Sequence, residues 1–224
     1  MRLALFDLDH TLIPYDSGMA WLRFLVDQGR LPAEVEARYL EHCLGHVGGT
    51  VDVHALHRAL VLPLREVGRA TLDAWLAEFE AGLAPTLPSA ARALVDRHRE
   101  AGDRCCLVTA TTRCVAERYA AAFGIGEVIA TEALADSHGL LTGEIAGPPC
   151  VGAHKLAKLE GWLQLEGLTL ASFEASAFYS DSYGDLPLLQ AVGTPVAVRP
   201  DPRLRAHAEQ AGWTIEMLDE ARAP

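Results

Sequence analysis

The sequence has no long hydrophobic run, although half of its residues are hydrophobic and its mean hydropathy is +0.12. A membrane-spanning helix needs about 18 or more predominantly apolar residues in succession, which no stretch of this chain provides. The first expected strand begins near residue 2, which leaves no place ahead of it for a secretion signal. We therefore expect a cytoplasmic protein without a membrane partner.

Cysteine pairs with a regular spacing are also missing. The five cysteines are an odd number, and no two of them have Cys-x-x-Cys spacing. Such a set fits reduced cytosolic thiols better than a disulfide framework. Cys105 and Cys106 lie inside an apolar run, so we expect them in the core.

Positive charge is scarce. The chain has 19 Lys and Arg against 30 Asp and Glu, a formal net charge of -11 at pH 7. This charge argues against nucleic acid or an anionic membrane as a partner, since both attract positive surfaces. An anionic substrate would need local cations to capture it.

Three short apolar runs, near residues 2–6, 104–109 and 176–180, predict buried parallel strands. Further elements are expected between and after them: helices at 88–102, at 115–123 and from 186, and strands at 128–130 and 195–198. This alternation predicts an α/β fold with a Rossmann-like, doubly wound parallel sheet.

The alternation is interrupted after the first strand. No strand candidate appears between about residues 16 and 84, and four amphipathic helical stretches follow one another, separated by glycine or proline. We therefore expect a core domain of residues 1–15 and 86–224 and an inserted helical bundle of residues 16–85. A β-hairpin is expected at 137–145.

Two aspartates, Asp7 and Asp9, directly follow the apolar run of the first predicted strand. Side chains at i and i+2 leave a strand on the same side, so two like charges would lie close together. A cation is the usual offset, and carboxylate oxygens suit Mg²⁺. Aspartate is also frequent in turns, and the pair taken alone fits a turn equally well.

Polar side chains follow the other two main strands as well. Thr109 and Thr111 end the second, Asp181 and Asp185 follow the third, and Lys155 lies on the helix that leads to the third. The carboxyl ends of parallel strands share one edge, and ligands bind there in open α/β sheets. The three strand ends together therefore predict one site.

Each of these residues has a simpler interpretation when taken alone. Thr109 would be a strand-end or helix-cap hydroxyl, and Asp185 an acid favoured at a helix N-terminus. Lys155 would be an ordinary residue of a helix surface, with Lys158 as a rival three positions later.

With these residues in this order, the chain resembles the haloacid dehalogenase-like (HAD) phosphohydrolases over nearly its whole length. The similarity is to the phosphoserine phosphatase-like branch (subfamily IB), which has a helical cap inserted after the first motif. Asp7-Leu8-Asp9-His10-Thr11 resembles the DxDxT motif of the family, Thr109 its second-motif Ser or Thr, and Lys155 its third-motif Lys. Asp181 and Asp185 resemble the closing acidic pair.

The resemblance implies a Mg²⁺-dependent phosphatase that hydrolyses a small phosphomonoester through an aspartyl phosphate. Asp7 would be the nucleophile, and Asp9 the general acid and then the base. Mg²⁺ would be held by Asp7, the backbone carbonyl of Asp9, Asp181 and waters.

The remaining motif residues would bind the phosphoryl group or support the site. Thr109, Ala110 and Lys155 would hold the transferring oxygens. Thr11 and Asp185 would be supporting residues, with Asp185 orienting Lys155 or a metal-bound water. Ser180 stands where the family often has glycine.

The helical insert should select the substrate. Asp16 stands where phosphoserine phosphatases carry a Glu that binds the substrate amine, which indicates phosphoserine or another amino-alcohol phosphate such as histidinol phosphate. Asp16 or Ser17 is equally well explained as a helix N-cap.

Several histidines and arginines of the chain are weaker candidates. His42 with His46 and His54 with His57 have spacings that can bind zinc, but no further ligand completes either pair, so a solvated or core histidine is the better explanation. Three arginines are candidate anion-binding residues on charge alone: Arg58, Arg65 and Arg113.

Two alternatives remain open at this point. One is a phosphotransferase with an alcohol acceptor, and the other is a non-catalytic sensor of a phosphorylated ligand. The oligomeric state is not predicted.

Overall fold

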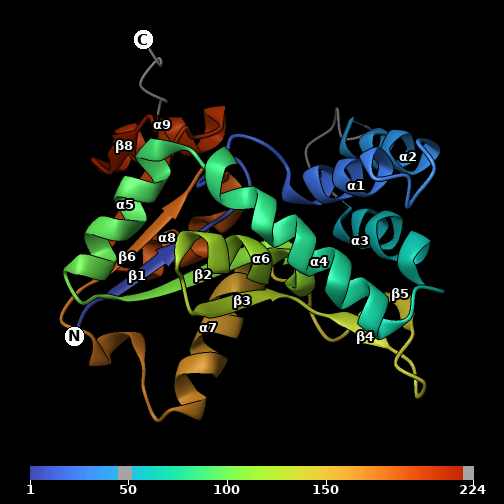
Figure 1. Cartoon of the computed structure of the whole chain (residues 1–224). Coiled ribbons are helices and arrows are strands. Elements are labelled where there is room, and N and C mark those ends of the chain that lie inside the picture. The colour runs from blue at the N-terminus through green and yellow to red at the C-terminus, as the bar shows by residue number, and fades with distance from the viewer. Residues whose placement is uncertain (45–51, 219–224) are drawn as a thin grey trace.

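The computed structural model describes residues 1–44 and 52–218. In these residues, six parallel strands form one sheet in the order β3-β2-β1-β6-β7-β8 (Figure 1). Their bounds, in that order, are Glu127–Thr131, Arg104–Thr112, Leu3–Phe6, Ser176–Ser180, Thr194–Val198 and Thr214–Glu216. The predicted parallel sheet and its three main strands are confirmed.

The central strand β1 brings the three predicted strand ends together. Its four residues are apolar and buried, as expected of an inner strand covered on both faces. Phe6 is paired with Leu107 of β2 and with Tyr179 of β6. In this register, the residues that follow β1, β2 and β6 leave the sheet at the same edge.

Helices cover both faces of the sheet. Ala4 and Phe6 of β1 pack with α5 (Ser89–Glu100) and α6 (Arg113–Phe123). Leu3 and Leu5 pack with α7, α8 and α9 on the other face. The bounds of these three helices are Ala153–Leu165, Leu186–Ala191 and Pro202–Ala211. The sheet is therefore doubly wound as predicted, although α9 and β8 were not predicted from the sequence.

The segment after β1 is helical. It contains α1 (Ser17–Asp27), α2 (Glu34–Leu44), α3 (Val53–Val61) and α4 (Arg69–Leu83), and its described part contains no strand. Figure 1 shows α1, α2 and α3 grouped together beyond the sheet. Short 3₁₀ turns complete the chain: η1 Leu62–Leu64, η2 Ala84–Thr86, η3 Leu170–Ser172 and η4 Tyr183–Asp185.

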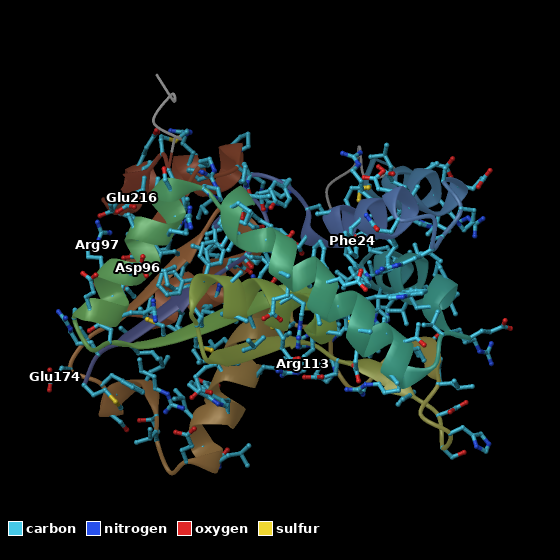
Figure 2. All side chains as sticks on the ribbon, in the orientation of Figure 1. Phe24, Asp96, Arg97, Arg113, Glu174 and Glu216 are labelled. Atoms are coloured by element: carbon cyan, nitrogen blue, oxygen red, sulfur yellow. The ribbon has the colours of Figure 1, made fainter. Side chains whose placement is uncertain are left out.

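Aromatic rings join this helical segment to the core. Trp21 stacks on Phe24, which Figure 2 labels, and meets the ring of Phe79 on α4 edge-on at 5.2 Å. Phe79 in turn contacts Tyr119 of α6 at 5.8 Å between ring centroids. These edge-to-face pairs fix α1 and α4 against the helix that follows β2.

The predicted hairpin is present as β4 (Ala133–Ala135) and β5 (Leu141–Ile145), which pair antiparallel. It packs against the helical segment, since a Cβ built on Gly143 would come within 2.5 Å of Leu62 Cδ2 in η1. All five cysteines are free thiols, and Cys105 and Cys106 are buried as expected. Across the described ranges, none of the helices is both long and apolar enough to cross a membrane.

Candidate active site

Asp7, the first residue after β1, is held through its backbone and its side chain. Its N–H donates to Tyr179 O on β6 at 2.9 Å. Lys155 Nζ, at the start of α7, lies 2.9 Å from Asp7 Oδ1 and donates to Asp185 Oδ2 at 2.7 Å. All three side chains are buried. The lysine therefore bridges two carboxylates and leaves Asp7 Oδ2 without a hydrogen bond from the described residues.

Ser180, the last residue of β6, fixes one end of this bridge. Its hydroxyl donates to Asp185 Oδ2 at 2.7 Å and accepts from Ser182 N at 3.2 Å. The Ser180 hydroxyl therefore donates a hydrogen bond that glycine, which the family often has at this position, could not supply.

Burial shapes the charges of this group. Burial raises the pKa of Asp7 to about 7; Lys155 opposes the rise, and the charges of Asp185 and Asp181 add to it. Burial would lower the pKa of Lys155, but the charges of Asp185 and Asp7 outweigh it and raise that pKa. Lys155 is therefore a permanent cation beside Asp7.

Asp181, directly after β6, is tied to the loop that follows β1. Thr11 Oγ1 donates to Asp181 Oδ1 at 2.9 Å and accepts from Asp181 N at 3.0 Å. Burial raises the pKa of Asp181 to about 6, while the hydrogen bond from Thr11 opposes the rise. This reciprocal pair joins two segments that are 170 residues apart in the sequence.

The loop after β1 is also held from outside. His10 has a positive φ of 59°, a backbone conformation that residues other than glycine adopt only at an energetic cost. Arg199, which follows β7, donates from Nη2 to Thr11 O at 2.6 Å and to His10 O at 3.2 Å, and from Nη1 to Leu218 O at 2.7 Å. The guanidinium therefore fixes the strained turn beside Asp9.

Asp9 lies between α1, the first helix of the segment after β1, and the end of β2. Its Oδ1 accepts from Ser17 N at 2.8 Å, and its Oδ2 accepts from Thr111 Oγ1 at 2.9 Å. Burial and the charge of Asp16 raise the pKa of Asp9 to about 8, against the hydrogen bonds from Ser17. Asp9 therefore keeps its proton to a higher pH than a solvent-exposed aspartate does.

Thr109 is buried within this group. Its hydroxyl donates to Thr111 Oγ1 at 3.1 Å and accepts from Thr111 N at 3.2 Å. Ala110 and Thr111 line the neighbouring cleft, whereas Thr109 is not among the described residues that line it. Thr109, Ala110 and Thr111 of β2 thus contribute to the site in different ways.

The donor set fits a divalent cation. Asp7, Asp181 and Asp185 lie around a single lysine, so the group has an excess of negative charge, and the charge of Asp185 adds to the rise in the pKa of Asp7 and of Asp181. Within the described ranges, no group of three or more His, Cys, Asp or Glu side chains is arranged to hold a metal. The set that fits is smaller: two carboxylates, from Asp7 and Asp181, and the Asp9 carbonyl, with water completing the shell as Mg²⁺ prefers.

A cleft of about 1110 Å³ opens beside these residues. On its cap side, Asp16 is the N-cap of α1, and its Oδ1 accepts from Met19 N at 2.7 Å and from Tyr39 OH at 3.1 Å. Asp16 Oδ2 has no hydrogen bond from the described residues. Leu56 and Leu60 of α3 add an apolar wall. Asp16 is thus both a helix cap and an acidic group of the cleft.

The histidines do not form a zinc site in the described residues. His57 is buried, its Nδ1 lies 3.0 Å from Thr112 Oγ1, and burial lowers its pKa, so it is a neutral core histidine. His46 of the pair His42 and His46 lies outside the described residues.

The arginine candidates are engaged elsewhere. Arg58 pairs with Glu144 at 3.2 Å, and Arg113, which Figure 2 labels, pairs with Glu132 at 2.6 Å. Neither these two nor Arg65 is among the described residues that line the cleft; the cations that line it are Lys155 and Arg203.

Sequence reasoning placed Thr111 at the predicted edge without a role of its own, gave Ser17 only as an N-cap candidate, and did not single out Tyr39 or Arg199. Thr111 was visible as a second hydroxyl at the end of β2, and its contact with Asp9 spans 102 residues. Tyr39 lies on an amphipathic helix with nothing to distinguish it from a core aromatic residue. These contacts depend on how distant elements pack, which short-range patterns do not encode.

Comparison with known proteins agrees with the fold and shows the family. Residues 4–190 match the model of the haloacid dehalogenase-like hydrolase family. A histidinol-phosphatase from Neisseria meningitidis serogroup C (strain 8013) is 36% identical over 216 residues, which cover 96% of this chain and 97% of that protein.

Two solved structures are similar over nearly the whole chain. The crystal structure of a protein of unknown function from Bordetella pertussis Tohama I has a TM-score of 0.87 and 39% identity, with 97% of this chain and 99% of that chain covered. A substrate-bound phosphoserine phosphatase complex has a TM-score of 0.62 and 19% identity, covers 97% and 93%, and supports the fold alone. Because the family match spans most of the sequence, this chain belongs to the haloacid dehalogenase-like hydrolases.

Proposed function

We propose that this hydrolase is a Mg²⁺-dependent phosphatase that acts on a small phosphomonoester through an aspartyl phosphate. The observation that carries the proposal is that two aspartates lining one cleft have different hydrogen-bond partners. Asp7 has a lysine 2.9 Å from one oxygen, and its other oxygen has no hydrogen bond from the described residues. Both oxygens of Asp9 accept hydrogen bonds, and burial raises the pKa of Asp9 to about 8, against about 7 for Asp7. One suits a nucleophile and the other a proton donor.

In the first step, Asp7 Oδ2 attacks phosphorus and the bond from phosphorus to the substrate oxygen breaks. That oxygen takes the proton of Asp9 and leaves as an alcohol, so Asp7 becomes an acyl phosphate and Asp9 a carboxylate. Lys155 holds a non-bridging phosphoryl oxygen, where negative charge must be met by preorganised donors.

In the second step, a water molecule attacks the same phosphorus and gives a proton to Asp9. The bond between phosphorus and Asp7 Oδ2 breaks, inorganic phosphate leaves, and both aspartates return to their starting states. Asp185 and Ser180 keep Lys155 in place throughout, through the 2.7 Å contacts on Asp185 Oδ2.

Mg²⁺ would be held by Asp7, Asp181 and the Asp9 carbonyl, with Thr11 orienting Asp181. When bound, the ion supplies positive charge that offsets the repulsion between the nucleophilic carboxylate and the phosphate. We further propose that residues 16–85 act as the cap and that residues 1–15 and 86–224 form the catalytic core of a cytoplasmic protein.

The substrate class follows from the cap side of the cleft. Asp16 presents an unengaged carboxylate oxygen there, and the apolar wall of α3 lies beside it. Among the described residues, the cap contributes no Lys or Arg to this lining, so a substrate carboxylate would lack a partner there. The geometry therefore favours an amino-alcohol phosphate such as histidinol phosphate over phosphoserine, in line with the activity named for the Neisseria relative.

Phosphate release from a panel of small phosphomonoesters tests the proposal. The panel would contain histidinol phosphate, phosphoserine, phosphoethanolamine and glycerol phosphate, with Mg²⁺ or with EDTA. We expect metal-dependent release that is fastest for histidinol phosphate and is lost in Asp7→Asn. Transfer to an added alcohol without release of phosphate would indicate a phosphotransferase, and metal-dependent binding without turnover would indicate a sensor; either result would contradict the proposal.

A further inference from the structure

The hydroxyl of Thr111 is the centre of a buried cluster beside Asp9. It lies 2.9 Å from Asp9 Oδ2, 2.9 Å from Ser17 Oγ and 3.1 Å from Thr109 Oγ1. A threonine hydroxyl has one proton to donate and two lone pairs that accept, so these three contacts use its full capacity. Thr111 is 8% exposed and lines the cleft.

The direction of each hydrogen bond follows from this count. Thr109 donates to Thr111, which also accepts from Ser17 and donates its own proton to Asp9 Oδ2. The second oxygen of Asp9 accepts from the Ser17 N–H at 2.8 Å. Each oxygen of Asp9 therefore accepts one hydrogen bond, one from a backbone N–H and one from a hydroxyl, and the two together fix the orientation of the carboxyl group.

The local backbone explains how Thr111 reaches this position. Val108 pairs with Ile129 of β3 and Thr112 pairs with Thr131, so four steps along β2 correspond to two steps along β3. The residues between form a bulge, and bulges beside active sites redirect side chains out of the regular ladder. The bulge places the Thr111 hydroxyl against Asp9 and against the first residue of α1.

We propose that Thr111 is a positioning residue for Asp9, and that its hydroxyl aims Asp9 Oδ2 at the oxygen of the leaving alcohol. The proposal rests on the acid role proposed above for Asp9. Ser17 extends the cluster to the first turn of α1, so the same hydrogen bonds connect the proton donor to the start of the helical segment.

The test compares two substrates that differ in their need for an acid. The alkyl alcohol of histidinol phosphate must be protonated as it leaves, whereas the weakly basic phenolate of 4-nitrophenyl phosphate leaves without a proton. General acid catalysis contributes about 100-fold or more, so we expect Thr111→Val to lower kcat/KM at least about tenfold for the alkyl substrate. For the nitrophenyl substrate we expect kcat/KM to change by less than about twofold, because this parameter ends at the first irreversible step, before Asp9 is needed as a base.

Three controls keep the outcome specific. Thr111→Ser restores the hydroxyl and should recover the wild-type ratio of the two substrates, and Thr111→Ala gives a second hydroxyl deletion if valine is not accommodated. Thr112→Val removes the neighbouring buried hydroxyl, which bonds His57 rather than Asp9, and should leave the ratio unchanged. Asp9→Asn should show the same selective loss as Thr111→Val.

The possible results separate this inference from the proposed function. An equal loss for both substrates in Thr111→Val, or no loss for either, overturns the role of Thr111 while leaving the phosphatase intact. A wild-type protein that hydrolyses neither substrate, or an Asp9→Asn variant that loses both equally, overturns the proposed function itself.

Discussion

At the scale of single residues, the site concentrates ionisable groups that are buried or half-buried. Asp7, Lys155 and Asp185 are buried together, and Asp9 and Asp181 lie at the same strand ends. Burial disfavours charge, and only one cation among the described residues contacts these carboxylates, so the pKa values of Asp7, Asp9 and Asp181 are raised. The negative charges of the site therefore destabilise the folded state, and binding of a proton or a metal ion reduces this destabilisation.

Asp9 makes the stability of the metal-free protein depend on pH. Its pKa is raised from 3.8 to about 8 on folding, so between these values the folded state binds a proton that the unfolded state does not. The stability from this group is present below its unfolded pKa and is lost as the pH rises through about 8. With EDTA, the free energy of unfolding should thus fall between about pH 5 and about pH 8.

Asp9→Asn removes this group without changing its size. The fall in the variant should be smaller than in the wild type by at least about 1 kcal/mol, the equivalent of roughly one pKa unit. Urea unfolding at the two pH values, with all samples metal-free, measures the difference. An equal fall in both proteins would show that Asp9 is ionised in the folded state at neutral pH.

Asp16 should act on the part of the substrate that differs between phosphomonoesters. A charge-assisted hydrogen bond contributes about 1.5–3 kcal/mol, so Asp16→Asn should lower kcat/KM for phosphoethanolamine by roughly 10-fold to 100-fold. The effect on propyl phosphate, which has no amine, should be small.

Asp52 offers a matched control for this prediction. It is the N-cap of α3, as Asp16 is of α1, and its side chain accepts from Ala55 N at 3.1 Å, but it does not line the cleft. Asp52→Asn should thus alter neither substrate selectively. If Asp16→Asn slows both substrates to the same extent, the aspartate serves the helix and not the amine.

At the scale of elements, α1 and α2 are fitted to each other at Gly18. A Cβ at this position would collide with the hydroxyl of Tyr39 on α2 and come within 3.2 Å of Asp16 Oδ1. Glycine inside a helix is less favourable than alanine by about 0.8–1 kcal/mol. Position 18 thus requires glycine, because the Tyr39 hydroxyl that bonds Asp16 occupies the space that a Cβ would need.

A double-mutant cycle tests this fit. Gly18→Ala should destabilise the protein by about 1 kcal/mol or more in the wild type, because overpacking outweighs helix propensity. In a Tyr39→Phe background, where the hydroxyl is absent, the same change should be close to neutral or stabilising. Such non-additive effects are expected of two residues in contact, and urea unfolding of the four proteins measures the free energies of unfolding that show them.

Gly161, inside α7, is the control for propensity alone. No atom lies within 4 Å of a Cβ built there, so Gly161→Ala should stabilise the protein by roughly 0.5–1 kcal/mol. Additive effects of Gly18→Ala and Tyr39→Phe would mean that the two helices do not constrain each other at this point.

At the scale of the whole molecule, the net charge of -11 and the acidic site act in the same direction. Both favour cations over anions near the cleft, so a phosphorylated substrate depends on Lys155 and on a bound metal ion to approach Asp7. Metal binding should thus be coupled to the stability of the fold.

Mg²⁺ should stabilise the folded chain at constant ionic strength. A ligand at 100 times its Kd stabilises by about 2.7 kcal/mol when it binds only the folded state. Differential scanning calorimetry with Mg²⁺ titrated against NaCl of equal ionic strength should show a rise in Tm that Asp181→Asn greatly reduces.

Asp96→Asn is the matched control, because the side chain of Asp96 on α5 is half exposed, pairs with Arg99 at 2.9 Å and is not among the described residues that line the cleft (Figure 2). It should keep the full rise in Tm. A rise that survives in Asp181→Asn would place the ion elsewhere.

Much of the fold could be predicted from the sequence, because the patterns that indicate its elements are local. The runs Leu3–Phe6 and Ser176–Ser180 were recognised as buried strands from a few successive residues, and the helical insert from a repeating apolar stripe. The short elements α9 and β8 were not predicted, because a three-residue strand at a sheet edge carries too weak a pattern.

The sequence by itself determined which groups are present at the carboxyl edge of the sheet. Parallel strands that lead to Asp7, Thr109 and Asp181 must bring those ends together, because strand direction and order follow from local pattern and from right-handed crossovers. Only the tertiary structure decided the partners within that edge. That Thr111 bonds Asp9, and that Lys155 lies between Asp7 and Asp185, depends on strand register, a bulge in β2 and the depth at which α7 packs. The contact between Thr111 and Asp9 joins residues 102 positions apart, and its geometry arises from packing of the whole core and not from any short segment.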